Sequence, residues 1–532
     1  MPWTVWLPRQ PADQVARFRV VTKHQVSGWR FLFRRIDHAL VRRDASMIDD
    51  PQRGRSTALS VGIALACVLV AASAVLAFFK PAKQITDSTH IVAEQGTGAL
   101  YVFIGGRLYP ALNLTSARLA VGDAENPTNV TRDELARFPR GPLIGISGAP
   151  GVVADSGVRD SSWAICDTAT IGPAAPVDQS TGLPTTGLSS VHTTVIGTQL
   201  RTDPDSVRPI AAGEARLLRD DATTWLVYPD RDHGVVRAAL NLGDSAVMLA
   251  LGIDATAPVA PVSKGLLSAI PEVPPIKVPD VPGAGSTVTL SSGMTVPVGA
   301  VLAVSTVDQT AAYYLVSQSG VVQISSVLAA MVRNADAHGT MTTIAVRPDV
   351  IAANLRPGGW PGTASFPDHS VHIVDPERSG VTCFHWSRAS TDPSAATTLL
   401  VGRQLPLSVE EQRRTVPLVT AQTSHGATAD AAYMPRDTGR FVQVTGMDPV
   451  SPRRETLFWI SDSGVRYGID AKLGDNGDPT LNALGLKVPV PAPWSAVSLF
   501  AVGPTLSQAD ARILHEGLPV DKSAVGLPGG NP

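Results

Sequence analysis

The chain has 532 residues, more than one ordinary hydrophobic core holds, so we expect two or more folded units. Its formal net charge of −2 conceals a split, because residues 1–55 carry eleven Lys/Arg against five Asp/Glu and the remainder carries 33 against 41. The acidic remainder argues against nucleic-acid binding, for which a basic surface is required.

Residues 1–55 contain a basic amphipathic stretch. Apolar residues recur there at spacings of three and four, which predicts one face of a helix: Val26, Trp29, Phe33, Ile36 and Leu40. Arginines supply the polar side, and Pro51 is expected to end the helix. Such a helix beside a membrane can lie on anionic lipid or dock on a partner. Alternatively, the arginines serve only to set membrane topology.

Residues 56–79 are predicted to form a transmembrane helix. They contain no charged residue, and 24 helical residues reach about 36 Å, enough for a hydrocarbon core of about 30 Å. A buried core helix is usually shorter, and a cleaved signal peptide starts nearer the terminus. Basic residues are denser before the stretch than after it, so the N-terminus is placed in the cytoplasm and the rest is exported.

Two of the three cysteines, Cys166 and Cys383, lie in the exported part, whereas Cys67 lies within the predicted span. An oxidising compartment favours a disulfide between the exported pair, and that disulfide would join distant parts of the chain. Two separate buried thiols are the alternative. Neither cysteine has a second ligand at the spacing of a zinc finger, so we expect no metal site.

The exported part contains four weak copies of one pattern. Each begins with an aromatic or aliphatic strand, a turn and a second strand, which is typical of a hairpin: LYVF at 100–103, WLVY at 225–228, YYLV at 313–316 and LFWI at 457–460. Three copies continue into a helix-like piece, from Asn113, Ser325 and Pro479. Alternatively, the hairpins are only those of any Gly-rich β-protein.

The copies divide the exported part into an α+β arrangement of four small repeats around a β-rich central domain. The repeats are predicted at 88–149, 213–285, 286–354 and 441–516, and the central domain at 150–212 and 355–440. Because each central segment holds one cysteine, the disulfide would join the two segments. The last segment, 517–532, is expected to be disordered.

Motifs for chemistry are absent from the sequence. There is no Gly-Lys dipeptide and therefore no phosphate-binding loop of the common type, and neither G-x-S-x-G nor H-E-x-x-H occurs. The histidines are scattered, and His385 beside Cys383 is most simply explained by packing. We therefore expect no catalytic, cofactor-binding or metal-binding residue.

The sequence resembles a known family. VTKHQVSGWRFLFRRIDHALVRRD at 21–44, with Met47 and Asp50-Pro51, is similar to the N-terminal motif of EccB proteins of the actinobacterial type VII (ESX) secretion machinery. The resemblance continues through ALYVFIGGRLYPALNLTSARLAVG at 99–122 and FPRGPLIGISGAPG at 138–151, and includes the cysteine pair. It covers about residues 17–510, whereas the first 14 residues have no match.

The resemblance implies a single-pass protein of the inner membrane with a periplasmic domain of α/β repeats and one disulfide. It implies assembly with EccC, EccD and EccE subunits and the mycosin protease, and self-association in a ring of six-fold character. The expected docking residues on the cytosolic helix are His24, Trp29, Arg30, Phe33, Arg34 and Arg35. The implied function is that of a structural and assembly subunit.

Two other functions stay open. Some EccB descriptions name an ATPase, which would require ATP and a site that the sequence does not reveal. The repeats could instead bind glycan of the cell envelope.

Overall fold

The computed structural model describes residues 22–43, 52–78, 84–86, 88–169, 191–221, 223–305, 311–335, 342–420, 427–436, 438–474 and 477–518. The chain divides into two compact units, Met1–Ala82 and Lys83–Pro532. Most of the tail predicted from Gly517 lies outside the described residues. The basic helix was predicted to end at Pro51, but it ends earlier, at Arg42, because Arg43 takes the left-handed conformation.

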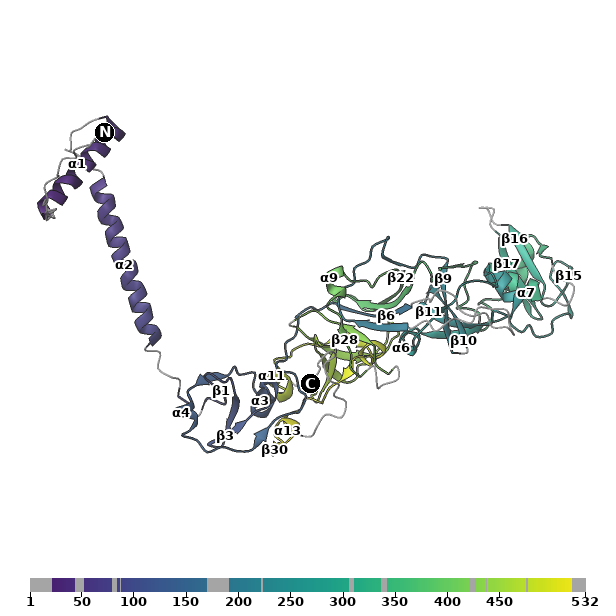
Figure 1. The fold of residues 1–532 in the computed structure, drawn as a ribbon. Helices are drawn as coiled ribbons and strands as arrows, with labels where there is room; N and C mark the ends of the chain where they lie inside the picture. Colours follow the sequence, from purple (N-terminus) through teal and green to yellow (C-terminus); the bar gives the residue numbers. More distant parts are fainter. Residues whose placement is uncertain are drawn as a thin grey trace, which may run out of the picture. The chain divides into compact units, whose positions relative to one another are not determined.

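Two helices make up the described part of the first unit (Figure 1). Helix α1 spans Lys23–Arg42, and the backbone N–H of Thr22 donates to Gln25 Oε1 at 3.0 Å at its start. Arg43 ends the helix in the left-handed conformation, with φ 57°. Helix α2 spans Gln52–Phe78 and contains the predicted apolar stretch. Within the described residues, no helix is both long enough and apolar enough to cross a membrane.

The second unit is built on a seven-stranded sheet in the order β23-β24-β7-β6-β21-β22-β8. Its strands are β6 (Ser161–Ala169), β7 (Val191–Ile196), β8 (Val207–Pro209), β21 (Val381–Arg388), β22 (Ala396–Gly402), β23 (Val416–Pro417) and β24 (Ala431–Tyr433), with α9 (Val409–Gln412) nearby in sequence. The sheet therefore takes strands from both segments that the sequence assigns to a central domain. Strands β6 and β21 pair antiparallel with Cys166 opposite Cys383, and the two cysteines form a disulfide.

The first small sheet has the order β3-β2-β1-β4. Its elements are β1 (Ile91–Glu94), β2 (Leu100–Ile104), β3 (Arg107–Pro110), α3 (Leu114–Val121), β4 (Thr128–Val130) and α4 (Arg132–Leu135). The β2–β3 turn places Gly105 and Gly106 at φ 57° and 75°, where a side chain would be strained. Strand β5 (Leu143–Ile144) pairs with β30 (Leu514–His515), which comes from the far end of the described chain.

The second and third small sheets follow one another in the sequence. The second has β9 (Glu214–Asp220), β10 (Thr223–Asp230), β11 (Gly234–Leu240), β12 (Ala260–Pro261), β13 (Glu272–Ile276) and β20 (His372–Ile373), with α5 (Ser245–Leu251) and α6 (Lys264–Ala269). The third has β16 (Val301–Ser305), β17 (Ala311–Ser317), β18 (Gly320–Ile324) and β19 (Ile344–Ala345), with α7 (Ser326–Ala335) and α8 (Pro348–Asn354). Strands β14 (Thr287–Thr289) and β15 (Thr295–Pro297) form a separate hairpin.

The fourth small sheet has the order β28-β25-β26-β27-β29. Its elements are β25 (Arg440–Thr445), β26 (Leu457–Ile460), β27 (Val465–Ile469), α11 (Pro479–Leu484), β28 (Val490–Pro493), α12 (Trp494–Val497), β29 (Ala501–Val502) and α13 (Gln508–Ala511). The hairpins predicted in the four copies are present as β2–β3, β10–β11, β17–β18 and β26–β27. The division of the exported part into four repeats stays a prediction.

The small sheets share hydrophobic cores. One core joins the first sheet to the fourth, through side chains such as Val102 and Trp459, and α3 lies beside α11 and α13 (Figure 1). Another joins the second sheet to the third, through Leu217 and Leu315. A third core joins the central sheet to its neighbours, and there Trp163 meets Phe500 edge to face at 6.1 Å. The first and third sheets also have small cores of their own, around Leu108 and Val316, so the shared cores add to local ones.

Candidate functional site

The docking residues predicted from the sequence all lie on α1. Trp29 and Phe33 are one helical turn apart, and their ring centroids are 5.6 Å apart. They remain 63% and 58% exposed, and the other residues of the apolar face are exposed as well: Val26, Ile36 and Leu40. An exposed aromatic face of this length is typical of a surface that binds a partner or a membrane.

The charged residues of α1 flank this face. At about 100° per residue, Arg30 and Arg34 follow Trp29 and Phe33 around the helix, whereas His24 and Arg35 lie on the opposite side. All four side chains are exposed. The apolar face therefore has one cationic border, which suits a partner groove with an acidic edge or an anionic lipid surface.

The central sheet buries the disulfide and its surroundings. Cys166 and Cys383 are fully buried, and Trp163 pairs with Trp386 across the same two strands. His385 lies within hydrogen-bond distance of the Ser162 hydroxyl, with 3.0 Å between Oγ and Nε2, and burial lowers its pKa to about 4. His385 is therefore neutral at pH 7 and has a packing role.

A buried carboxylate connects the central sheet to α6. Asp167, only 2% exposed, accepts from the Thr193 hydroxyl at 2.9 Å and from the Ser263 hydroxyl and backbone N–H at 2.8 and 2.7 Å. Ser263 is the N-cap of α6 and also accepts from Leu266 N–H. Burial raises the pKa of Asp167 to about 6; its hydrogen bonds act in the opposite direction, and the charge of Asp430 adds to the rise. No sequence pattern had indicated that Asp167 would be buried or would contact α6.

The raised pKa of Asp167 predicts a pH-dependent stability. The folded protein binds this proton more tightly than the unfolded chain, so the contribution is full below about pH 4 and is lost as the pH rises through about 6. We expect the unfolding free energy of the wild type, relative to Asp167→Asn, to fall over that interval by on the order of 2–3 kcal/mol. Denaturant titrations of both proteins at pH 4, 5, 6 and 7 measure it. A difference that grows with pH contradicts the assignment.

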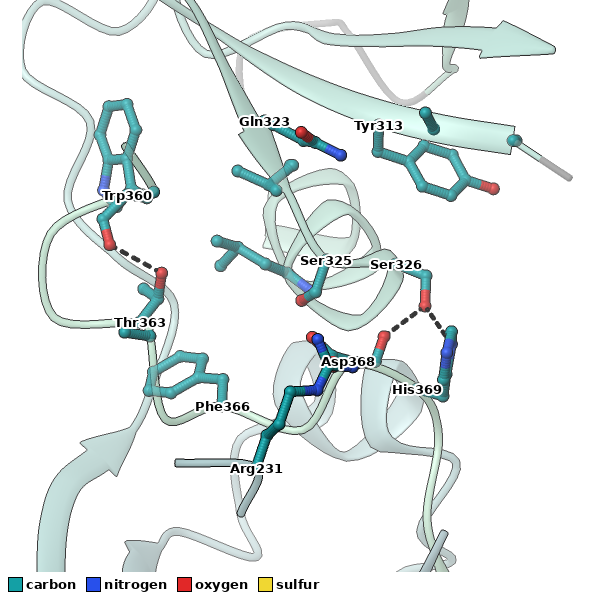
Figure 2. Close-up of a pocket in the computed structure, with 16 residues that line it drawn as sticks. Arg231, Tyr313, Gln323, Ser325, Ser326, Trp360, Thr363, Phe366, Asp368 and His369 are labelled. Carbon is teal, nitrogen blue, oxygen red and sulfur yellow. Dashed lines mark hydrogen bonds and ion pairs between the residues drawn. The ribbon is translucent and has the colours of Figure 1, made fainter. Parts of the chain in front are cut away.

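A cleft of about 490 Å³ lies between the second and third sheets. Figure 2 shows Tyr313 and Gln323 on one side of it and Arg231 and Asp368 on the other. Arg231 Nη2 is 2.9 Å from Asp368 Oδ2, and both side chains are exposed. The start of α7 forms part of the wall through Ser325 and Ser326.

This cleft brings a serine, a histidine and an aspartate together without the geometry of a catalytic triad. The Ser326 hydroxyl donates to the backbone carbonyl of Asp368 at 2.7 Å and lies 3.3 Å from His369 Nδ1. The Asp368 carboxylate pairs with Arg231 rather than orienting the imidazole (Figure 2). A triad requires the carboxylate on the second imidazole nitrogen, so this arrangement does not activate a nucleophile. Within the described residues, no group of acidic, histidine and cysteine side chains is placed to hold a metal ion.

Comparison with known proteins shows that one family includes residues of both units. The family described as "Type VII secretion system ESX-1, transport TM domain B" matches residues 18–520, from α1 to beyond β30. The chain belongs to the EccB family. EccB3 of the ESX-3 system of Mycolicibacterium smegmatis is 37% identical over 94% of this chain and 91% of its own length. EccB1 of the ESX-1 system of Mycobacterium tuberculosis is 35% identical over 96% and 98%. The names of both relatives include the word ATPase.

Solved structures agree with the EccB assignment. A chain of the intact ESX-5 inner membrane complex matches with a TM-score of 0.71 and 31% identity, over 95% of this chain and 98% of that one. A chain of an EccB3 dimer from the ESX-3 core complex matches with a TM-score of 0.68 and 35% identity, over 80% of this chain and all of that one. EccB3 thus occurs as a dimer in the ESX-3 core complex, and most of this chain has its fold.

Proposed function

We propose that this chain is a structural and assembly subunit of the inner-membrane core complex of a type VII secretion system. The observation that carries the proposal is the extent of the match, because 95% of the chain corresponds to a chain of an intact ESX-5 complex. The match therefore includes every part that a connecting subunit needs, namely a cytosolic helix, a membrane segment and exported sheets. Purification of the chain from membranes tests this proposal, and we expect to recover it in a large membrane complex rather than as a free chain.

The proposed membrane topology rests on α2 and on charge. The apolar side chains of its middle part are all more than half exposed: Leu59, Val61, Ile63, Leu65, Val68, Leu69 and Val70. They surround the helix rather than following one face, as in a helix that lies in lipid. Although the described residues of α2 alone do not reach the length and apolarity of a span, we propose that α2 crosses the inner membrane once. The basic segment before it then places the N-terminus in the cytoplasm and the remainder in the periplasm.

Each part of the chain has a proposed contact. The Trp29 face of α1 docks on cytosolic parts of EccC, EccD or EccE subunits, and α2 packs among their membrane helices. The small sheets, which share cores in pairs within this chain, supply contacts between EccB copies and with the mycosin protease in a periplasmic ring. The EccB3 dimer supports self-association of this kind.

ATP hydrolysis is a second candidate only because the names of the relatives include it. The chain has no Gly-Lys dipeptide, so a phosphate loop of the common type is absent. We expect the purified full chain to release phosphate from ATP no faster than a buffer blank. A colorimetric phosphate assay over a range of chain concentrations measures it. Release proportional to chain concentration, and removed by a point change within the chain, would establish the ATPase instead.

A further inference from the structure

A small cavity with three arginines lies at the junction of the central and fourth sheets. Its volume is about 330 Å³, and every charged side chain that lines it is an arginine: Arg159, Arg388 and Arg454. Arg159 precedes β6, Arg388 ends β21, and Arg454 lies in the segment before β26. The remaining wall includes Ser390, Gln443 and the backbone that leads into β28. Three separate segments thus place guanidinium groups on one concave surface.

The guanidinium groups keep donors that protein acceptors do not use. Arg388 donates through Nε to the Asp392 carbonyl at 2.9 Å, and among the described residues its two Nη groups have no acceptor. Arg454 donates only through Nη1, to Thr445 Oγ1 and to backbone carbonyls. Arg159 is the exception, since it pairs with Asp155 at 3.1 Å and also donates to the Val488 carbonyl. Arg388 and Arg454 therefore hold charge for which the described chain supplies no carboxylate.

The wall of this cavity is fixed from behind by a buried arginine. Arg440, only 6% exposed, donates to Ser156 Oγ at 3.2 Å, to the Val158 carbonyl at 3.0 Å and to the Asp160 carbonyl. The Asp160 side chain accepts, through its carboxylate oxygen Oδ1, from Ser390 N–H at 2.9 Å, and this hydrogen bond fixes the turn after β21. A ligand would therefore meet an ordered surface and would not have to pay the entropy of ordering it.

The charge of this cavity contrasts with that of the chain around it. The part of the chain after residue 55 has more Asp and Glu than Lys and Arg, yet the lining of this cavity has three cations and no anion. Guanidinium groups brought together repel each other unless an anion joins them. Arg159 already has Asp155 as its carboxylate partner, so the charge available to a ligand is that of Arg388 and Arg454. Arginines that lack a matching acid are the usual form of a site for phosphate or carboxylate.

We propose that this arginine pocket binds a phosphate group. A carboxylate has two coplanar oxygens, and one arginine fork satisfies them, whereas the tetrahedral oxygens of phosphate accept from guanidinium groups that approach from three directions. The volume suits one phosphate with an adjoining small group rather than an extended polyanion. The phosphate comes either from a phosphodiester, as in a lipid headgroup or an envelope polymer, or from a free phosphate monoester.

Binding to the full chain in mild detergent tests the proposal. The probes are inorganic phosphate and glycerophosphoglycerol, a phosphodiester headgroup without acyl chains, each titrated calorimetrically at constant ionic strength. The double variant Arg388→Gln/Arg454→Gln should bind at least about tenfold more weakly than the wild type. The matched control is Arg231→Gln, which removes a cavity-lining arginine that Asp368 already neutralises, and it should bind like the wild type.

The two probes distinguish a phosphodiester ligand from a free phosphate, and three results would overturn the proposal. Binding of glycerophosphoglycerol in preference to inorganic phosphate supports a phosphodiester ligand, and the reverse supports a free phosphate. A hexaglutamate peptide that competes as well as either phosphate probe overturns the proposal in favour of an acidic-peptide surface. Absence of binding by both phosphate probes, or equal binding by the wild type and the double variant, also overturns it. The far-UV circular dichroism of each variant confirms that it is folded.

Discussion

Replacing Cys166 by serine is expected to lower the unfolding free energy of the second unit, Lys83–Pro532, by about 2–5 kcal/mol. The disulfide joins residues 217 positions apart, so it removes a large loop-closure entropy from the unfolded chain. The second and third small sheets lie almost entirely within that loop. The bond therefore joins β6 to β21, the strand with which the chain returns to the central sheet after forming the second and third sheets.

The position of Cys166 adds a packing cost to the entropic one. Cys166 and Cys383 are fully buried beside Ala164, Ile196 and Leu400, so a serine hydroxyl would be placed among apolar groups. Thermal and denaturant unfolding of the full chain in detergent, with and without reductant, measure the loss. Cys67→Ser is the control, because Cys67 is a free and exposed thiol outside the second unit. Equal melting of oxidised and reduced wild type would contradict the prediction.

Trp29→Ala and Arg34→Glu are each expected to prevent or strongly impair incorporation of the chain into the membrane complex. The first removes the largest apolar side chain of the exposed α1 face, and truncation of such an anchor typically costs about 2–4 kcal/mol of binding free energy. The second reverses the charge at the cationic border of that face. Blue native electrophoresis of detergent-solubilised membranes shows incorporation, and carbonate extraction shows that insertion is unchanged.

Two conservative variants separate docking from general damage to α1. Phe31→Ala removes an apolar side chain that is 53% exposed but lies on the opposite side of α1 from Trp29 and Phe33, so the complex should form normally. Arg34→Lys keeps the charge and should retain most of the incorporation. If Trp29→Ala assembles as well as Phe31→Ala, the role assigned to the α1 face is wrong.

Local structure was predictable wherever short-range chemistry determines it. The hairpin at β2–β3 follows from Gly105-Gly106, which the turn requires at positive φ. The helix after it follows from Asn113, whose side chain accepts from Ser116 N–H at 2.8 Å. In contrast, α5 was not expected, although Asp244 caps it in the same manner. Length does not explain this difference, because α11 is one residue shorter than α5 and was predicted.

Long-range pairing was accessible from sequence at one place only. The cysteine pair indicated that β6 and β21 belong to one domain, because a disulfide is specific to two residues. Nothing comparable indicates that Leu514 pairs with Ile144, or that β20 joins the second sheet. These contacts depend on packing between faces of similar composition, so a single sequence does not indicate which face pairs with which.

The candidate sites also differ in whether their residues are near one another in the sequence. The docking residues of α1 are close in sequence, so their helical spacing revealed them. Asp167 meets Ser263 across 96 residues, and the three arginines of the phosphate pocket come from positions 159, 388 and 454. Single charged residues on separate segments of the chain form no sequence motif, and only the fold brings them together.

The central claim is that the chain functions as a subunit of a membrane secretion complex. The most direct test is to extract the affinity-tagged full chain from its own membranes in mild detergent and to measure the mass and composition of the purified particle. We expect one large particle that contains several copies of the chain together with an EccC-type motor subunit and further membrane subunits. Recovery of the chain alone, as a monomer or dimer, from membranes in which the other subunits are present and intact would contradict the account.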